Sequence, residues 1–129
     1  LPIIHHPAYS GGFVSPGVSG VADYLQLGLL PRIFGADMSI FVSYGGRFTF
    51  TEEQCKRISS YIKRPMGLMK AACPAPGGGV TDARLNELVE LYGNDTMFLV
   101  GGDMFRRGPD IEANMSYFVE RLTKLSERT

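Results

Sequence analysis

The stretch Met-Phe-Leu-Val-Gly-Gly-Asp, residues 97–103, decides how the fold of this chain is interpreted. Four apolar residues end abruptly in two glycines. Such a run is typical of a buried parallel strand that passes into a turn where the backbone approaches another group closely. We therefore expect a strand at residues 96–100, with Gly101 and Gly102 at its carboxyl end.

A second copy of this pattern lies upstream. Residues 66–69, Met-Gly-Leu-Met, lead through Pro-Ala-Pro at 74–76 into three glycines at 77–79. Glycine N–H groups with no side chain beside them form a good nest for phosphate oxygens. In β/α barrels the loops after the last two strands often build such a nest. Each turn alone is equally typical of a tight strand-to-helix connection, but two on consecutive units favour an anion site.

Composition limits the classes of function. The 129 residues suffice for one domain with a core, and we expect a single domain over residues 1–129. Acidic and basic residues balance at 13 each, which gives no electrostatic case for nucleic acid. No apolar run approaches membrane-spanning length, and no signal peptide is visible. Cys55 and Cys73 lack metal-ligand spacing, so we interpret them as free thiols in a reducing cytoplasm.

Apolar periodicity predicts alternating strands and helices. Residues 10–20 are rich in small side chains and are expected to form a mobile or ligand-covering loop. The expected strands are residues 2–4, 38–42, 66–70 and 96–100. The expected helices are 21–34, in two pieces broken at Gly28 and Pro31, then from Thr51 to before Pro65, from Thr81 to Gly93, and from near Pro109 to Leu125. The order implies an α/β fold with a parallel sheet and right-handed crossovers.

Four consecutive βα units are compatible with two architectures. They can form a small doubly wound domain or half of an eight-unit (β/α)8 barrel, which typically needs ~250 residues. A half barrel leaves two open edges, near residues 2–4 and 96–100, and inward-facing residues such as Ile40, Leu68 and Leu99 lose their cover. We therefore expect the chain to pair with another copy or with a separate N-terminal half.

Several short motifs, in order, resemble one known family. These are His-His-Pro-Ala at 5–8, Phe-Gly-Ala-Asp at 34–37, Gly-Gly-Arg at 45–47, Gly-Gly-Gly-Val at 77–80, Tyr-Gly-Asn-Asp at 92–95 and Val-Gly-Gly at 100–102. Together they resemble the C-terminal half of the barrel domain of the RuBisCO large subunit, and more closely that of the RuBisCO-like proteins. The resemblance covers the whole chain and implies four consecutive units of a TIM (β/α)8 barrel.

The resemblance assigns roles to five residues. His6 matches a histidine at the end of the fifth barrel strand, beside the substrate. Gly79, Gly101 and Gly102 match glycines whose backbone amides hold a substrate phosphate. Arg47 falls where the family has the lysine of a mobile loop over the active site. His6 is thus the catalytic candidate, and the other four are phosphate-binding candidates, with Arg47 equally readable as a solvated loop arginine.

Departures from the carboxylase pattern are informative. Pro7 stands where the carboxylase has a phosphate-binding arginine, Ile40 where it has a second active-site histidine, and Gly77 where it has a serine. These losses argue against carboxylation of a bisphosphate sugar. The resemblance therefore implies an enolase or isomerase that acts on a phosphorylated methylthio-sugar.

The family's metal site, a carbamylated lysine with two acidic residues, lies on an earlier strand. We expect no metal ligand in this chain, and Mg²⁺ only in a complete family member. The isolated chain is expected to be inactive. Two alternatives remain open, namely a non-catalytic phosphate-binding or structural half-barrel module, and part of a true ribulose-bisphosphate carboxylase.

Overall fold

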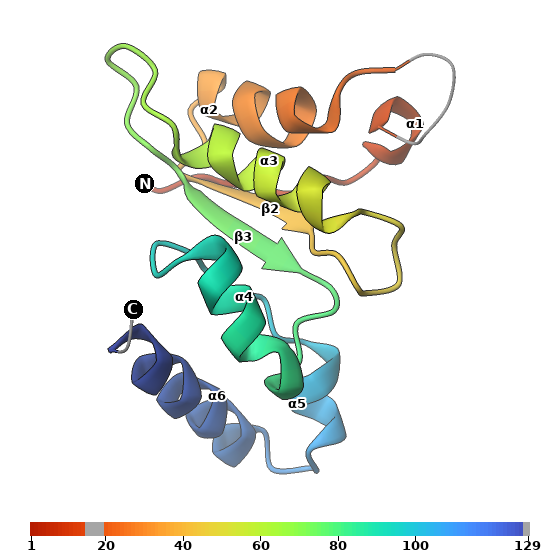
Figure 1. Cartoon of the computed structure of the whole chain (residues 1–129), viewed down its shortest axis with the longest axis vertical. Coiled ribbons are helices and arrows are strands. Elements are labelled where there is room, and N and C mark those ends of the chain that lie inside the picture. The colour runs from red at the N-terminus through yellow and green to blue at the C-terminus, as the bar shows by residue number, and fades with distance from the viewer. Residues whose placement is uncertain (15–19, 128–129) are drawn as a thin grey trace.

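The computed structural model describes residues 1–14 and 20–127 (Figure 1). Its strands are β1 (Ile4–His5), β2 (Met38–Val42) and β3 (Cys73–Gly77). Its helical elements are α1 (Gly11–Val14), the π-helical η1 (Tyr24–Leu29), α2 (Leu30–Ile33), α3 (Glu52–Lys63), the 3-10 helix η2 (Asp82–Arg84), α4 (Leu85–Tyr92), α5 (Gly102–Arg106) and α6 (Ile111–Ser126). The expected α/β fold with alternating elements is confirmed.

Within the described residues, the sheet has the order β1-β2-β3, and both pairs are parallel. Ile4 pairs with Met38 in the first ladder, and Val42 pairs with Gly77 at the end of the second. The arrowheads of β2 and β3 point to the same side in Figure 1, away from the N-terminus of the chain. The carboxyl ends of the strands therefore meet at one edge, as in a β/α barrel.

The prediction of a third strand at residues 66–70 is wrong. This segment is a tight turn in which Met69 N donates to Met66 O at 2.9 Å, and Gly67 has a φ of 56°. The buried guanidinium of Arg32 holds the turn, because its Nη2 donates to Lys70 O at 2.8 Å. Lys70 thus lies in a loop and not in a strand, and Leu68, expected to face inwards, is fully exposed at the tip.

The true third strand begins at Cys73 and contains two prolines. Cys73 N donates to Asp37 O, and Ser43 N donates to Gly77 O, so the odd-numbered residues of β3 bond to β2. Pro74 and Pro76 present their nitrogens to the opposite side, where the missing N–H groups cost no bond to β2. The pattern argued against a strand because proline is rare inside sheets.

The expected fourth strand, residues 96–100, pairs only weakly with β3. Met97 N donates to Pro74 O at 2.9 Å, and Leu99 N donates to Pro76 O at 3.1 Å. A parallel ladder would also give Met97 O a donor at position 76, but proline has no N–H. Within the described residues the pairing is therefore reduced to an isolated parallel bridge between Gly77 and Leu99.

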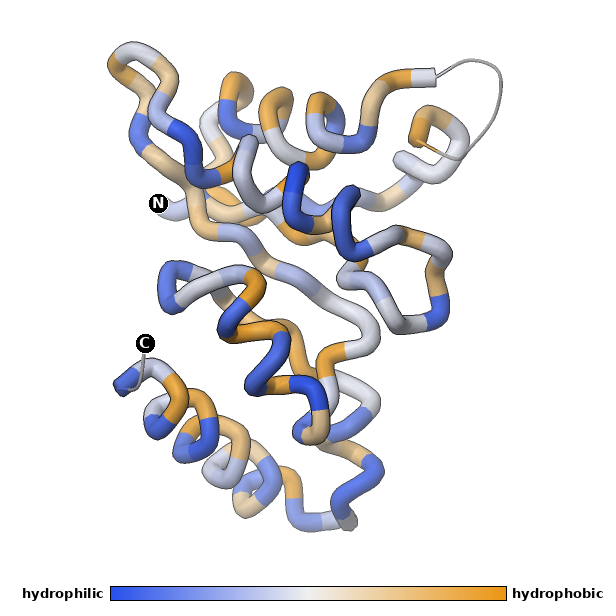
Figure 2. Tube along the Cα trace, viewed as in Figure 1, coloured by the Kyte–Doolittle hydropathy of each residue, from blue (hydrophilic) through white to orange (hydrophobic). Residues whose placement is uncertain are grey.

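One face of the sheet packs against the helices and forms the core. Phe41 of β2 is 1% exposed, and Cys55, Ile58 and Ile62, which recur along one face of α3, are fully buried. α4 and α6 pack beside each other, and hydrophobic residues recur along both (Figure 2). The core residues are Leu27, Phe41, Cys55, Ile58, Ile62, Ala72, Val80, Leu85, Leu88, Val89, Tyr92, Phe118 and Leu125.

Local signals placed the helix ends well in most cases. Thr51 and Gln54 form the expected capping box of α3. The break expected at Gly28 and Pro31 takes the form of a π-helical segment that continues into α2. α5 was not predicted, and α6 begins at Ile111 because Asp110, not Pro109, caps it. α1 lies inside the expected loop, of which residues 15–19 fall outside the described residues.

Apolar side chains are exposed at both ends of the described strand order. Ile4 on β1 is 53% exposed, and Met97 on the last extended segment is 40% exposed. Apolar residues recur along α6, but their exposure differs. Phe118 and Leu125 are buried, whereas Ile111, Met115 and Val119 are exposed. Among the helices of the described residues, none is both long and apolar enough to cross a membrane.

Candidate functional site

A large cleft lies at the carboxyl ends of the strands. Its volume is about 1500 Å³, and its walls come from the segments that follow β1, β2, β3 and the extended segment 96–100. Every residue singled out by the sequence as a site candidate lines it, namely His6, Arg47, Gly79, Gly101 and Gly102. Four segments far apart in the sequence thus share one opening.

The glycine exits of β2 and β3 touch each other. A Cβ on Gly79 would lie 2.8 Å from Gly46 N, and one on Gly46 would lie 2.9 Å from Gly79 N. Gly79 also has a φ of 73°, a left-handed conformation that side chains disfavour. These two glycines are therefore required by the close approach of the loops themselves.

Gly101 and Gly102 differ, because nothing in the described residues lies within 4 Å of a Cβ built on either one. Neither has a positive φ. Their small size is thus not needed for internal packing, and the space in front of them opens into the cleft.

Several backbone N–H groups at the cleft lack an internal acceptor. Within residues 1–14 and 20–127, the N–H groups of Gly46, Gly79, Gly101 and Gly102 donate to no protein atom. Backbone donors are nearly always paired with protein, water or ligand. These donors belong to residues from three separate exits that line one opening, an arrangement suited to an anion-binding nest.

Charged side chains around the nest are mixed in sign. Arg47 is exposed on the loop after β2, with its guanidinium 4.9 Å from the Phe48 ring centroid. Arg106 forms a salt bridge with Asp103 at 3.1 Å. Asp103 also accepts a hydrogen bond from Asp82 N at 2.9 Å, so its carboxylate faces the start of η2.

The two histidines lie on opposite sides of β1. His6 is exposed and lines the cleft. His5 turns to the helix side, where its Nδ1 lies 3.0 Å from Ser39 Oγ. Because Ser39 Oγ donates to Leu27 O at 2.6 Å, the Nδ1 of His5 is the donor in its own bond. Burial, with a smaller effect of His6, lowers the pKa of His5.

Sequence reasoning missed one residue behind the cleft. Arg84 lies at the start of α4, and its Nη1 donates to Tyr44 O at 2.7 Å and to Gly79 O at 3.1 Å. Its Nη2 donates to Glu87 at 2.8 Å, and the guanidinium stacks on the Tyr44 ring at 4.4 Å. The Arg-x-x-Glu spacing was visible in the sequence, but it indicates only a helical ion pair.

Arg84, Tyr44 and Glu87 form a cluster, in which Tyr44 and Glu87 also contact each other. The Tyr44 hydroxyl donates to Glu87 Oε1. Burial, together with the Glu87 hydrogen bond, raises the pKa of Tyr44 to about 12. The hydrogen bond from Arg84 lowers the pKa of Glu87. The cluster is thus an ion pair shielded by a ring, with Glu87 compensating the charge of Arg84.

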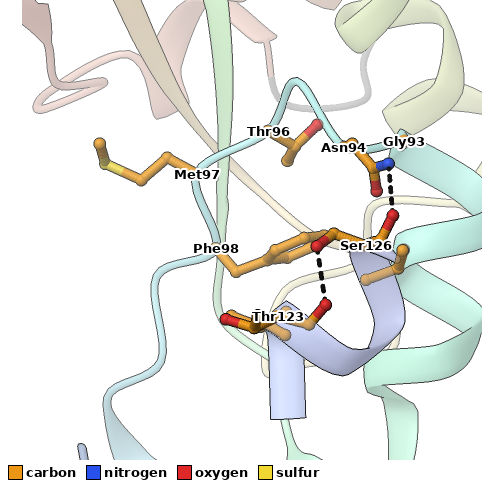
Figure 3. Close-up of a pocket in the computed structure, with 9 residues that line it drawn as sticks. Gly93, Asn94, Thr96, Met97, Phe98, Thr123 and Ser126 are labelled. Carbon is orange, nitrogen blue, oxygen red and sulfur yellow. Dashed lines mark hydrogen bonds between the residues drawn. The ribbon is translucent and has the colours of Figure 1, made fainter. Parts of the chain in front are cut away.

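A second, smaller cavity lies at the opposite end of the strands (Figure 3). Its volume is about 380 Å³, and it lies between the end of α4, residues 93–98 and the end of α6. Asn94 Nδ2 donates to Ser126 O at 3.2 Å, and Ser126 Oγ donates to Thr123 O at 2.8 Å. The first bond joins the segment after α4 to the end of α6, and the second lies within α6. The hydroxyls of Thr96 and Thr123 also donate to backbone carbonyls, of Tyr92 and Val119.

Neither cavity provides a metal site from this chain alone. Within the described ranges, no three His, Cys, Asp or Glu residues lie close enough together to hold a metal ion. Cys55 is buried against β2, where its Sγ donates to Val42 O at 3.3 Å, and burial raises its pKa.

Comparison with known proteins agrees with this geometry. No model of a known protein family matches the chain. It is 35% identical over 118 residues to the ribulose bisphosphate carboxylase-like protein 1 of Rhodopseudomonas palustris, which covers 92% of this chain and 30% of that protein. It is 31% identical to the 5-methylthioribulose-1-phosphate isomerase of Rhodospirillum rubrum, over 87% of this chain and 30% of that protein.

An enolase is among the relatives as well. The 2,3-diketo-5-methylthiopentyl-1-phosphate enolase of Exiguobacterium sibiricum is 32% identical over 79% of this chain and 26% of its own length. The chain therefore spans only about a third or less of the curated relatives it matches.

Solved structures show the same similarity. A Rubisco-like protein from Rhodopseudomonas palustris matches with a TM-score of 0.81 and 33% identity, over 95% of this chain and 31% of that one. A Rubisco-like protein from Alicyclobacillus acidocaldarius matches with a TM-score of 0.88 and 28% identity, over the whole of this chain and 32% of that one.

The strands are parallel and alternate with helices, and the glycine-rich segments that follow them line one cleft. This is the arrangement of part of a β/α barrel. Within that class, the homologues of this chain are the RuBisCO-like proteins, as its motifs indicated.

Proposed function

We propose that this chain is the phosphate-binding, C-terminal half of the barrel of a RuBisCO-like protein that acts on a phosphorylated sugar as an enolase or isomerase. The observation that carries the proposal is that the N–H groups of Gly79, Gly101 and Gly102 find no acceptor in the part of the chain that the structure describes. These glycines line one cleft with His6 and Arg47. The names of the relatives, an isomerase and an enolase of phosphorylated methylthio compounds, support the substrate class.

Each residue has a task that its position suits. The glycine amides hold the phosphate oxygens, because a nest of N–H groups carries partial positive charge without side-chain entropy. Arg47, on the exposed loop after β2, closes over the anion with its planar fork of donors. His6 hydrogen-bonds the reacting oxygens from its place just after β1, since it lines the cleft and an imidazole ring can both donate and accept hydrogen bonds.

Mg²⁺ is expected in the complete protein, where it would stabilise charge on the reacting oxygens. Within the described residues, no group of three or more His, Cys, Asp or Glu side chains is placed to hold a metal ion. The roles proposed for this chain are therefore those of its glycine amides, Arg47 and His6. The isolated chain is accordingly proposed to bind phosphate without turnover. Turnover of a phosphorylated sugar by this chain alone, with Mg²⁺ added, would contradict that part of the proposal.

Glycine substitution combined with phosphate titration tests the site. A ligand that binds only the folded state stabilises it by about 2.7 kcal/mol at a hundredfold excess over its Kd. Phosphate should therefore raise the unfolding midpoint relative to chloride at equal ionic strength. Gly101→Ala should fold normally, because its Cβ meets open space, yet should lose most of this shift.

Gly12→Ala is the matched control, since its Cβ also meets nothing within 4 Å and it does not line the cleft. It should keep the full phosphate shift. An unchanged midpoint of the parent chain in high phosphate would contradict the proposed site.

Assembly is part of the same proposal. The open edges at Ile4 and Met97, and the exposed side of α6, suit either a second copy of the chain or a separate N-terminal half, within a reducing cytoplasm. Sedimentation at micromolar concentration tests self-association, and a single species near 14.1 kDa would contradict it.

A further inference from the structure

We propose that Arg84 is the positioning residue of the anion nest, because it fixes the exit loops of β2 and β3 to each other before any ligand arrives. This inference rests on the proposed phosphate site, and it adds a residue that neither the motifs nor the names of the relatives indicate. Arg84 does not line the cleft, so it acts through the backbone of the loops and not on the anion itself.

The contacts of Arg84 reach both loops from one guanidinium. Nη1 donates to the carbonyl of Tyr44, in the exit of β2, and to the carbonyl of Gly79, in the exit of β3. No other side chain in the described residues donates to both of these loops. The planar fork of arginine, unlike the point charge of lysine, can hold several acceptors in a fixed geometry.

These carbonyl bonds also orient the amides. In a trans peptide the C=O and N–H point in opposite directions. When Arg84 holds the Tyr44 and Gly79 carbonyls, it fixes the peptide planes 44–45 and 79–80, which directly adjoin the nest residues Gly46 and Gly79. The N–H groups of these two planes, on Gly45 and Val80, are turned away from the guanidinium. Neither N–H has an acceptor within residues 1–14 and 20–127.

Two glycines make room for the guanidinium. A Cβ on Gly45 would lie 2.6 Å from Arg84 Nη1, and one on Gly79 would lie 3.2 Å from the same atom. Both glycines have left-handed backbones, with φ of 73°. Part of the glycine content of these exits is thus explained by Arg84, and not by the anion.

The charge of Arg84 is largely compensated. Nη2 and Nε donate to the Glu87 carboxylate, and the guanidinium lies over the Tyr44 ring. A compensated cation adds little long-range attraction for a phosphate, so its contribution is geometric. This separates the proposal from a general electrostatic effect, because Arg84→Lys keeps the charge and removes the fork.

The test measures phosphate affinity and loop order independently. Arg84→Lys should bind inorganic phosphate about tenfold more weakly, since one ammonium cannot hold both carbonyls and Glu87. In the ligand-free protein, NMR order parameters at Gly46 and Gly79 should fall, while that of Gly93, at the other end of the strands, should not change. Tyr44→Phe is the matched control, because it removes only the hydroxyl contact to Glu87 and should bind within about twofold of the parent.

Arg84→Gln serves as a second variant if the lysine variant does not fold, and it should show the same loss of affinity and of order. Unchanged affinity and unchanged order in a folded Arg84 variant would overturn the positioning role. A parent chain that binds no phosphate, with loops that nevertheless loosen in Arg84→Lys, would overturn the proposed site and leave Arg84 only as a link between the loops.

Discussion

At their carboxyl ends the strands run into glycines whose N–H groups lack acceptors within the described residues, whereas at their amino ends the chain engages its own polar groups. The large cleft lies at the first end and the small cavity of Figure 3 at the second. In β/α barrels, function gathers at the carboxyl face and stability at the opposite face. Substitutions at the two ends should therefore separate ligand binding from stability.

The largest effect is expected from Gly79→Ala. A left-handed alanine costs about 1–2 kcal/mol, and the new Cβ would collide with the loop after β2. We expect a loss of about 2–4 kcal/mol in the free energy of unfolding and no measurable phosphate shift. Urea unfolding with and without phosphate checks both.

Gly93→Ala is the control at the amino end, with a φ of 76° and only an ordinary contact to Lys63 Nζ at 3.6 Å. Its ψ of 176° places Gly93 in a backbone region that essentially only glycine adopts, so the substitution should cost about 1–3 kcal/mol and keep the full phosphate shift. Equal loss of the phosphate shift in both variants would break the distinction between the two ends.

Acidification should weaken the links that hold the carboxyl end. Tyr117 donates to Asp82 at 2.8 Å, and this bond, with Arg121, lowers the pKa of Asp82. The stability from such a group is fully present above its unfolded pKa, ordinarily near 3.8, and is lost as the pH falls through the lowered folded value. Asp82→Asn should cost about 1 kcal/mol at neutral pH, because solvent screens a partly exposed carboxylate, and should flatten the decline below about pH 4. Urea unfolding midpoints of the parent and of Asp82→Asn, measured from neutral to acidic pH, check this. An equally steep loss of stability at acidic pH in both proteins would contradict the prediction.

A smaller effect is expected at the amino end from Asn94→Ala. The substitution removes the bond from Nδ2 to Ser126 O, which links the ends of α4 and α6. The cost should be about 1 kcal/mol in unfolding free energy, with phosphate affinity unaltered. A phosphate titration of this variant that departs from the parent would show that the two ends are coupled.

The smallest change in stability is expected for Arg47→Ala. The side chain is exposed, and within the described residues its guanidinium makes no ion pair or hydrogen bond and lies over the Phe48 ring, so stability should change by less than about 0.5 kcal/mol. Phosphate affinity should nevertheless fall about threefold to tenfold, since one charge-assisted contact is lost. Calorimetric titration with phosphate checks this. An equal Kd in Arg47→Ala and the parent would show that Arg47 is a solvated loop residue.

The carboxyl end was largely predictable because its signals are local. An apolar run followed by glycines indicates both a strand and an exit, so the glycines at 77–79 and 101–102 could be expected near the ends of strands without a structure. The choice of Gly79, Gly101 and Gly102 as phosphate-binding residues came from the family resemblance and stays a prediction. His6 and Arg47 followed from family motifs, and the structure brings both to the same cleft.

Other features depended on contacts between distant residues. β3 was displaced because Pro74 and Pro76 argue against a strand, and only the side to which their nitrogens point makes them acceptable. Arg84 was missed because its partners, Tyr44 and Gly79, are distant in sequence or lack side chains. The exposure of apolar residues on α6 could not be predicted, because helical periodicity shows which face of a helix is apolar but not which element packs against that face.

An NMR titration of the labelled chain with inorganic phosphate, at constant ionic strength, tests the central claim most directly. The amide signals of Gly79, Gly101 and Gly102 should shift together with one saturating Kd, because one anion contacts all three. The Gly93 signal, at the opposite end of the strands, should stay in place. Shifts that do not saturate, or that appear equally at Gly93, would contradict a phosphate site at the carboxyl ends of these strands.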